Sequence, residues 1–237
     1  MVKITVRHVV AAFAVWCAAI YAIFAILVLG GGDIKAKAEL GMVSGLLLFW
    51  VVIGGAAMYL LRDHVRAMFR KVPGDWRLKF FLFCVLLALV EEAVTTAMTN
   101  LGPFFGVKLM EVAITASADY FEVVTRHSVI VFLPMFAAWA LLLWRYRFSP
   151  ASVFLLWGIT GAFCESVAFG FQNLIIAGFW TFVYGLMMYL PAFSIPQDRN
   201  ARLPKWYHYP LAVLASFAAL VPVFIVAVIV LAIVQHV

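Results

Sequence analysis

Residues 79–101 read KFFLFCVLLALVEEAVTTAMTNL. The run exceeds the roughly twenty residues that an apolar α-helix needs to cross the hydrocarbon core of a bilayer. It nevertheless carries two adjacent glutamates, Glu91 and Glu92. An ionisable side chain is costly at membrane depth, so its presence there is a functional-site hypothesis by default. These residues therefore predict a transmembrane helix and the first half of a candidate site.

The composition of the whole chain places it in a membrane. Of its 237 residues, 67% are hydrophobic and 12% are charged. Soluble globular domains contain about 25% charged residues, and the mean hydropathy of this chain is +1.08. These values exclude a soluble globular domain. They predict an all-α integral membrane protein whose principal contact is the lipid bilayer.

Seven apolar runs are long enough to form transmembrane helices. No low-complexity linker or soluble domain interrupts them, so we expect residues 1–237 to form one membrane domain, a seven-helix bundle. The runs occupy about 8–29, 41–61, 79–101, 127–144, 151–176, 177–195 and 209–234.

Basic residues gather in alternate connections between these runs, at 62–79, 145–147 and 199–205. The other connections carry balanced charge or almost none. The positive-inside rule then predicts a cytoplasmic N-terminus and an outer C-terminus, and we assign the protein to a prokaryotic cytoplasmic membrane. The net charge of +6 is therefore a signature of topology and does not indicate a nucleic-acid partner. A further hypothesis is that the segment 62–79 binds anionic lipid headgroups.

The segment 102–126 is longer than a tight turn. Gly102-Pro103 ends the third helix, and apolar residues then recur at helical spacing among charged ones. This pattern is typical of an amphipathic helix on the membrane surface. Such a helix on the outer face either rests on lipid headgroups or roofs a cavity in the bundle.

One polar pattern occurs twice in the chain. Glu92 begins the triplet EAV and is followed by Asn100, and Glu165 begins the triplet ESV and is followed by Asn173. The two glutamates are 73 residues apart. Either a parallel internal repeat around the third and fifth helices or convergence of two helices explains the match.

Residues four, seven or eight positions apart share one face of an α-helix. Thr96 therefore joins Glu92 and Asn100 in a polar stripe on the third helix. By the same spacing, Gln172 joins Glu165 on the fifth helix. Each predicted stripe thus combines one carboxyl group with neutral hydrogen-bonding side chains.

The fourth helix returns the chain, so the third and fifth helices run in the same direction. Glu92 and Glu165 then lie at similar depth, about 12–15 Å below the outer helix ends at 1.5 Å per residue. We expect the two stripes to face each other, because carboxyl groups inside membranes pair or line wet cavities. Two touching carboxylates cannot both ionise cheaply, so a shared proton or a bound cation would resolve the conflict. Whether that cation is a metal is left open.

Glu91 and His127 are further candidates. Glu91 points about 100° away from Glu92 around the helix, so it reaches another partner or the edge of the same cavity. His127 opens the fourth helix at its outer end, near the expected level of Asn100 and Asn173. It is either a member of the site or an ordinary interfacial histidine.

Residues 89–92, LVEE, resemble the double-glutamate motif of the glutamate-type intramembrane peptidases, the CAAX-processing and PrsW-like group. Residues 161–165, GAFCE, look like the later glycine-rich helix of the PrsW-like branch. The resemblance implies a glutamate acting as general base on water, with a His and an Asn orienting the water or holding the oxyanion. Glu91 and Glu92 match the paired glutamates, and Glu165 matches the later one.

Two features depart from that family pattern. Thr96 stands where an Arg or Lys usually follows the glutamate pair. His127 precedes Glu165, although the family's histidine-bearing helix follows the later glutamate. The role of His127 therefore does not follow from the order of the motifs.

Three classes of function fit these residues. An intramembrane hydrolase would act on a membrane-embedded peptide or a small molecule, a transporter would use the glutamates as a proton or cation site, and a structural subunit would use them to join helices. No cofactor-binding fingerprint is present, and the oligomeric state is left open. The candidate catalytic residues are Glu91, Glu92, Glu165 and His127, and the candidates for positioning substrate or water are Thr96, Asn100, Gln172 and Asn173.

Overall fold

The computed structural model describes residues 5–222 and residue 225; residues 1–4, 223–224 and 226–237 lie outside the description. Within the described part the regular elements are helices, and one isolated bridge joins Tyr146 to Arg202. The α-helices are α1 (Val6–Gly30), α2 (Ile34–Leu46), α3 (Gly55–Lys71), α4 (Trp76–Asn100), α5 (Tyr120–Glu122), α6 (Val129–Arg145), α7 (Pro150–Phe169), α8 (Ala177–Ser194) and α9 (His208–Ala218). The other helical elements are the π-helices η1 (Leu47–Gly54) and η3 (Val123–His127) and the 3-10 helices η2 (Gly102–Phe105) and η4 (Phe171–Ile176).

Several of these helices fit a membrane-spanning protein. Five stretches of the described chain are long and apolar enough to cross a bilayer, and a sixth results if the bent pair α5–η3 and α6 counts as one span. The bend within that pair is 49°. The expected helix at 209–234 begins as α9, and its residues 223–224 and 226–234 lie outside the described residues. The five stretches are Val6–Gly30, Ile34–Lys71, Trp76–Asn100, Pro150–Phe169 and Phe171–Ser194.

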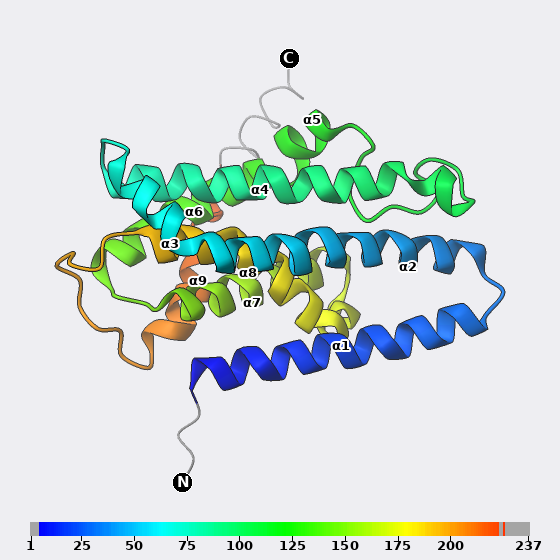
Figure 1. Cartoon of the computed structure of the whole chain (residues 1–237), viewed down its shortest axis with the longest axis horizontal. Coiled ribbons are helices and arrows are strands. Elements are labelled where there is room, and N and C mark those ends of the chain that lie inside the picture. Colours follow the sequence, from blue (N-terminus) through cyan, green and yellow to red (C-terminus); the bar gives the residue numbers. More distant parts are fainter. Residues whose placement is uncertain (1–4, 223–224, 226–237) are drawn as a thin grey trace, which may run out of the picture.

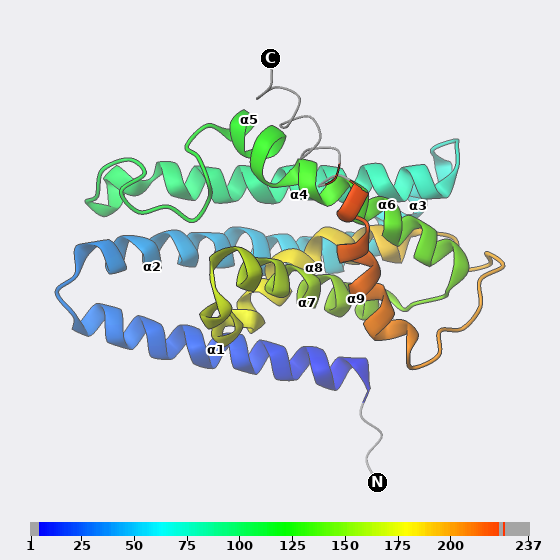
Figure 2. The same ribbon diagram turned by 180° about the vertical axis from the view of Figure 1, so that it is seen from behind.

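The long helices lie side by side. Figure 1 shows α2 and α3 as one rod between α1 and α4. In the reverse view, α7 and α8 lie against this layer and α9 crosses them at a steep angle (Figure 2). With 20 and 18 residues, α7 and α8 are shorter than the 25-residue helices α1 and α4. Because α7 and α8 are shorter, they extend along only part of the length of α1 and α4.

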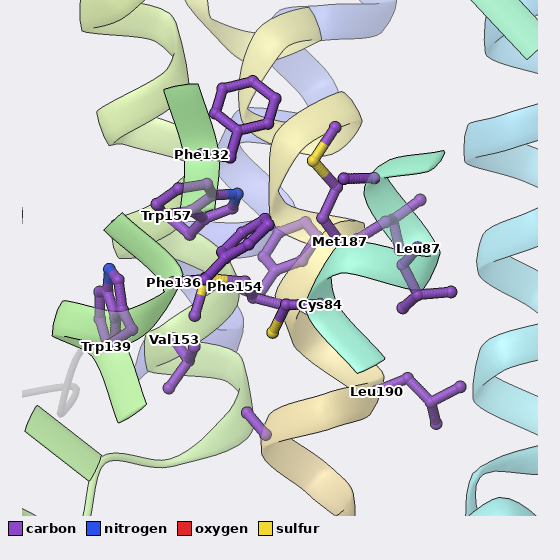
Figure 3. Packing of buried hydrophobic residues seen from close by; sticks show 14 of the residues in the cluster. Cys84, Leu87, Phe132, Phe136, Trp139, Val153, Phe154, Trp157, Met187 and Leu190 are labelled. Atoms are coloured by element: carbon purple, nitrogen blue, oxygen red, sulfur yellow. The ribbon is translucent and has the colours of Figure 1, made fainter. Parts of the chain in front are cut away.

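The apolar core lies where α4, α6, α7 and α8 meet (Figure 3). Aromatic rings fill most of it. The rings of Phe136 and Trp157 have centroids 5.0 Å apart, and Phe132 packs edge-on against Trp157 at 6.0 Å. Cys84 from α4 and Met187 from α8 close the remaining space and are fully buried. Burial of such large side chains is a main source of packing stability.

Small residues bring α7 and α8 into close contact, as the sequence indicates for membrane helices. A Cβ atom added at Gly158 would lie 2.7 Å from the Cα of Thr181, closer than atoms can pack. At Gly161, an added Cβ would lie 2.8 Å from the Cβ of Tyr184. The two glycines therefore make room for the backbone of α8 and for the side chain of Tyr184.

The helix expected at 151–176 ends earlier, at Phe169. Gly170 follows with a φ of +103°, a conformation that residues with a Cβ rarely adopt. The chain continues as η4, whose Ile175 carbonyl accepts a hydrogen bond from the Trp16 indole nitrogen of α1 at 3.1 Å. Because Trp16 lies near the middle of α1, the turn between α7 and α8 lies partway along that helix.

The second span begins earlier than the expected residue 41. The Asp33 carboxylate accepts the backbone N–H of Lys35 at 2.9 Å and so caps α2. The π-helix η1 then carries the helix without a break into α3. Residues 34–40 and 62–71, expected in connections, are therefore helical, and Glu39 lies on α2.

The segment 102–126 does not form the expected single amphipathic helix in this structure. The short helix η2 comes first, and the chain then turns at Gly106 and Met110, whose φ values are +85° and +62°. Such left-handed residues interrupt a right-handed helix. Only α5 and η3 are helical near its end, and the middle is a loop folded onto the bundle.

The basic segments lie at one end of the bundle. The guanidinium of Arg77 lies 5.3 Å from a ring centroid of Trp144, and that of Arg199 lies 5.8 Å from one of Trp76. These contacts join the start of α4, the end of α6 and the connection that follows α8, so the basic segments gather at one end as the alternation of basic residues predicts. We call this the basic end and the opposite end, which carries the loop 106–119, the loop end.

Replacing Gly158 by alanine should destabilise the protein by about 1–3 kcal/mol, the usual range for an overpacked core. The added methyl group would meet the backbone of Thr181, so α7 and α8 would have to separate. Thermal unfolding in detergent, followed by circular dichroism, measures the change. Gly30→Ala is the matched control, since a Cβ there would meet nothing within 4 Å. An unchanged midpoint for Gly158→Ala would contradict the close contact.

Candidate functional site

A cavity of about 870 Å³ opens where α7 and α8 stop short of the loop end. Side chains from α1, α2, α4, α6, α7 and α8 line it, together with the loop residues 113–116. Among the described residues, no lysine or arginine lines this cavity. Its acidic lining residues are Glu39, Glu91, Glu92 and Glu165.

The buried face of α4 brings both adjacent glutamates to the cavity. Buried positions along α4 come in neighbouring pairs, so Leu87 and Ala88 are followed one turn later by Glu91 and Glu92. This buried face packs toward α6 and α8. It is wider than the single predicted stripe of Glu92, Thr96 and Asn100, so it includes Glu91 as well. Glu91 thus reaches the same cavity as Glu92, one of the two outcomes that its position allows.

Glu91 is 5% exposed and has a hydroxyl partner one helical turn away. The Thr95 hydroxyl lies 2.8 Å from Oε1 of Glu91 and donates to it. The same hydroxyl lies 3.0 Å from the Glu91 carbonyl oxygen. A threonine four residues after a glutamate therefore holds its carboxyl group in place.

Glu92 is 7% exposed and also lines the cavity. The Ser128 hydroxyl donates to the Val123 carbonyl at 3.3 Å and lies near the Glu92 carboxyl group. Ser128 is the residue at the bend between η3 and α6, and it also lines the cavity. The bend in this span thus brings a hydroxyl group opposite Glu92.

Glu165 receives its partner from the next helix. The Tyr184 hydroxyl of α8 donates a hydrogen bond to Oε1 of Glu165. Tyr184 can reach α7 because Gly161 leaves space for its ring. An edge-on contact with Phe132 and a tilted contact with Trp180, whose ring centroids lie 5.7 Å and 5.9 Å away, hold that ring in position.

The buried glutamates Glu91 and Glu92 and the half-buried Glu165 form one electrostatic group. Glu165 lies near enough for its charge to act on both Glu91 and Glu92. With no cation in the lining, like charges and the loss of water make it costly to ionise all three. Within the described chain, no three His, Cys, Asp or Glu side chains are arranged to hold a metal ion. The group is therefore suited to exchange protons.

The expected pairing of the third and fifth helices differs from the arrangement found. These helices are α4 and α7, and they do run in the same direction (Figure 1). However, α4 packs against α6 and α8, whereas α7 packs chiefly against α8. Glu92 and Glu165 therefore line one cavity, where Tyr184 of α8 donates to Glu165, instead of facing each other across a direct helix contact.

The other candidate residues separate into two groups. His127 and Asn173 line the cavity, with His127 exposed and Asn173 half-buried. Thr96, Asn100 and Gln172 lie outside its described lining. Two of the candidates thus share the cavity with the glutamates, and three do not.

Local contacts explain where Asn100 and Gln172 lie. The Asn100 amide donates to the Ala118 carbonyl at 3.1 Å and so fastens the loop to α4. The Gln172 amide donates to the Phe169 carbonyl at 2.8 Å, in the turn that follows Gly170. Because α7 has ended by then, Gln172 and Asn173 no longer share a helix face with Glu165. The Thr96 hydroxyl is buried and lacks a hydrogen-bond partner among the described residues.

The cavity also contains one further glutamate and three hydroxyl-bearing neighbours of the glutamates that were not among the predicted site residues, namely Glu39, Thr95, Ser128 and Tyr184. Thr95 could have been found, because it lies four residues after Glu91. Glu39 was assigned to a connection because charged residues surround it in the sequence. Tyr184 and Ser128 reach the glutamates only through the packing of α8 and the bend before α6. The sequence contains no local signal for these last two.

The loop residues 113–116 form one wall of the cavity, and specific contacts hold them there. The backbone N–H of Ile114 donates to the Thr99 hydroxyl oxygen at 3.2 Å. Nearby, Glu111 accepts the Lys108 N–H at 2.9 Å and pairs with the Lys35 ammonium at 3.0 Å. The Lys108 N–H and the Lys35 charge hold the pKa of Glu111 below its usual value. The loop is thus fastened to both α2 and α4.

Apolar side chains connect the cavity to the lateral surface of the bundle. Val167 and Phe169 line the cavity and are 73% and 68% exposed. Phe24 of α1 and Ile175 of η4 also line it and are exposed. In a membrane, exposed apolar residues at this position face lipid chains. Apolar side chains at the surface of the bundle therefore border the cavity.

Comparison with known proteins adds no family to this description. No protein family, curated protein or solved structure matches the chain. The geometry of the cavity is therefore the basis for inferring a function.

Proposed function

We propose that the protein is an intramembrane hydrolase that acts on a membrane-embedded substrate, with a buried glutamate as general base. The observation that carries the proposal is the convergence of Glu91, Glu92 and Glu165 on one cavity that has apolar, lipid-facing walls. A substrate that enters from the bilayer would meet carboxyl groups away from bulk water. There a carboxylate is a stronger base toward a bound water molecule than it is in solution.

Glu92 is the best candidate for the general base. Glu91 accepts a hydrogen bond from Thr95, and Glu165 accepts one from Tyr184. Those bonds occupy one oxygen of each carboxyl group, whereas Glu92 is approached by the Ser128 hydroxyl at the bend. Glu92 therefore retains the most freedom to take a proton from water. Its position at the cavity surface also allows it to return that proton to a leaving group.

Other polar groups around the cavity would support the reaction. The Tyr184 hydroxyl holds Glu165, which can share protons with the base across the cavity. The Asn173 amide and the His127 ring line the same space and could donate to an oxyanion. Asn173 now donates to the Gly170 carbonyl at 3.1 Å, so its amide would have to turn toward a substrate.

The resemblance to glutamate-type intramembrane peptidases agrees with this proposal and suggests a peptide as the substrate. It rests on the residues 89–92 and 161–165. Both segments reach the cavity, through Glu91 and Glu92 and through Glu165. The placement of Tyr184 beside Glu165 is additional support that comes from packing alone.

A transporter is the second candidate, because a group of buried carboxyl groups could also carry protons or a cation. Transport requires a polar path to both sides of the membrane. Toward the basic end, the cavity is followed by the tightly packed layer of Cys84, Phe136, Phe154 and Trp157 (Figure 3). This layer favours the hydrolase. A structural role, in which the carboxyl groups only join helices, is disfavoured by the size of the cavity between them.

The orientation in the membrane is part of the proposal. We assign the basic end to the cytoplasmic side of a prokaryotic membrane, by the positive-inside rule. With α9 as a seventh crossing, the N-terminus is then cytoplasmic and the C-terminus outside. The parallel internal repeat remains a hypothesis drawn from the sequence. Labelling single cysteines introduced at Gly74 and Ser117 from each side of the membrane tests the orientation.

Glu92→Gln should abolish hydrolysis while the fold is retained, because an amide keeps the shape and hydrogen bonding of the side chain but cannot accept a proton. A screen for cleavage of transmembrane peptides in liposomes, with the wild type and the variant side by side, measures this. Asp63→Asn at the basic end is the matched control, since that carboxylate is exposed and lies outside the cavity. Its activity should equal that of the wild type.

Two results of that experiment would decide against the proposal. Cleavage by Glu92→Gln at the wild-type rate would remove the assigned base. Proton or cation flux into the same liposomes that Glu92→Gln loses, with no cleavage product from the wild type, would establish the transporter instead. A pH-sensitive dye inside the liposomes reports the flux.

Asn173→Ala and Asn100→Ala should differ, although both asparagines are predicted by the same repeat. Loss of Asn173 should reduce the rate about a hundredfold if its amide supports the oxyanion. Loss of Asn100 should have a much smaller effect, because its amide fastens the loop at Ala118 and lies outside the cavity. Single-turnover rates of the two variants measure the difference. Equal losses would contradict the separate positions of the two side chains.

A further inference from the structure

A second pocket, of about 370 Å³, lies at the basic end, between α3, α4 and α6. It shares no lining residue with the cavity that holds the glutamates. Three cationic side chains line it, namely Arg70, Arg77 and Lys79. Trp76 and Trp144 form its aromatic walls.

We propose that this pocket binds the headgroup of an anionic phospholipid. Three features point to this ligand: the cations, their level in the membrane and the apolar surface beside them. The pocket is independent of the proposed hydrolase activity, because none of the cavity residues takes part.

The cations retain hydrogen-bond donors for a phosphate. Arg70 is exposed and forms no ion pair with any described residue. Arg77 is paired with Asp75 through Nε and Nη2, which leaves Nη1 unused by that pair. The Lys79 ammonium donates to the carbonyls of Phe69 at 3.0 Å and Val72 at 2.7 Å and has one proton left. Arginine and lysine groups of this kind bind phosphate oxygens well.

Asp75 fixes the pocket without neutralising it. The Arg77 guanidinium beside it lowers the pKa of Asp75 to about 2, so this carboxylate remains ionised at neutral pH. It holds Arg77 in place and also caps α4 by accepting the Arg77 N–H at 2.8 Å. Three positive charges against one negative charge leave the pocket attractive to an anion.

The pocket lies at the level of lipid headgroups. Trp76 begins the span Trp76–Asn100, and Trp144 is next to the last residue of α6. Tryptophans at the ends of membrane helices mark the interface between hydrocarbon and water. Since α4 begins and α6 ends at this level, a phosphate in the pocket would lie where phospholipid phosphates lie.

Apolar residues beside the pocket favour a lipid over a free phosphate ion. Leu78 and Leu82 are exposed on α4, and Leu141 is exposed on α6 one turn from Trp144. These side chains descend from the headgroup level into the hydrocarbon and offer a surface for acyl chains. A free phosphate would leave them unused.

The test is a titration of the purified full chain with phosphatidylglycerol and with phosphatidylcholine of the same acyl chains, followed by native mass spectrometry. The wild type should retain phosphatidylglycerol preferentially. Arg70→Gln should weaken that binding about fivefold, the effect of one basic residue near an anionic headgroup, and Arg70→Glu should weaken it further. Because Arg70 is exposed, neither change should prevent folding. Excess inorganic phosphate should not displace the lipid.

Arg126→Gln is the matched control, since this arginine lies at the loop end and its side chain is 74% exposed. It should leave binding unchanged. Equal retention of both lipids, or equal weakening by Arg70→Gln and Arg126→Gln, would overturn the proposal. Displacement by inorganic phosphate would show a site for the free ion instead and would also overturn it.

Discussion

The close contact between α7 and α8 is the constraint on which the candidate site depends. Gly158 admits the backbone at Thr181, and Gly161 admits the ring of Tyr184. Only because the helices approach this closely can the Tyr184 hydroxyl reach Glu165. The same contact supports the aromatic layer that closes the bundle toward the basic end. A wider separation would remove both the partner of the carboxyl group and the floor of the cavity.

The early end of α7 has the opposite effect at the other end of the bundle. Gly170 turns the chain partway along α1, so α7 and α8 leave space that the long helices enclose. The loop from α4 covers part of this space, and apolar side chains such as Val167 border it on the lipid side. The bundle is therefore densely packed toward the basic end and encloses open space toward the loop end. The glutamates lie at the boundary.

At that boundary, each of the three carboxyl groups is near a hydroxyl group, and no lysine or arginine of the described chain lines the cavity. Thr95 donates a hydrogen bond to Glu91, Tyr184 donates one to Glu165, and Ser128 lies near Glu92. Neutral donors orient a carboxyl group without fixing its charge, whereas an arginine would keep it ionised. This choice of partners suits groups that must gain and lose a proton. It also separates the cavity chemically from the basic end, where cations gather.

The sequence by itself determined the membrane class, the positions of most spans and the three glutamates. Apolar length and the cost of burying a charge depend only on which residues follow one another. The tertiary structure alone decided which polar groups meet. Tyr184 and Ser128 come to the carboxyl groups through packing of α8 and a bend before α6, whereas Asn100 is drawn to the loop. Helical spacing places residues on a face, but the neighbour of that face depends on how closely separate helices can approach, and here two glycines set that distance.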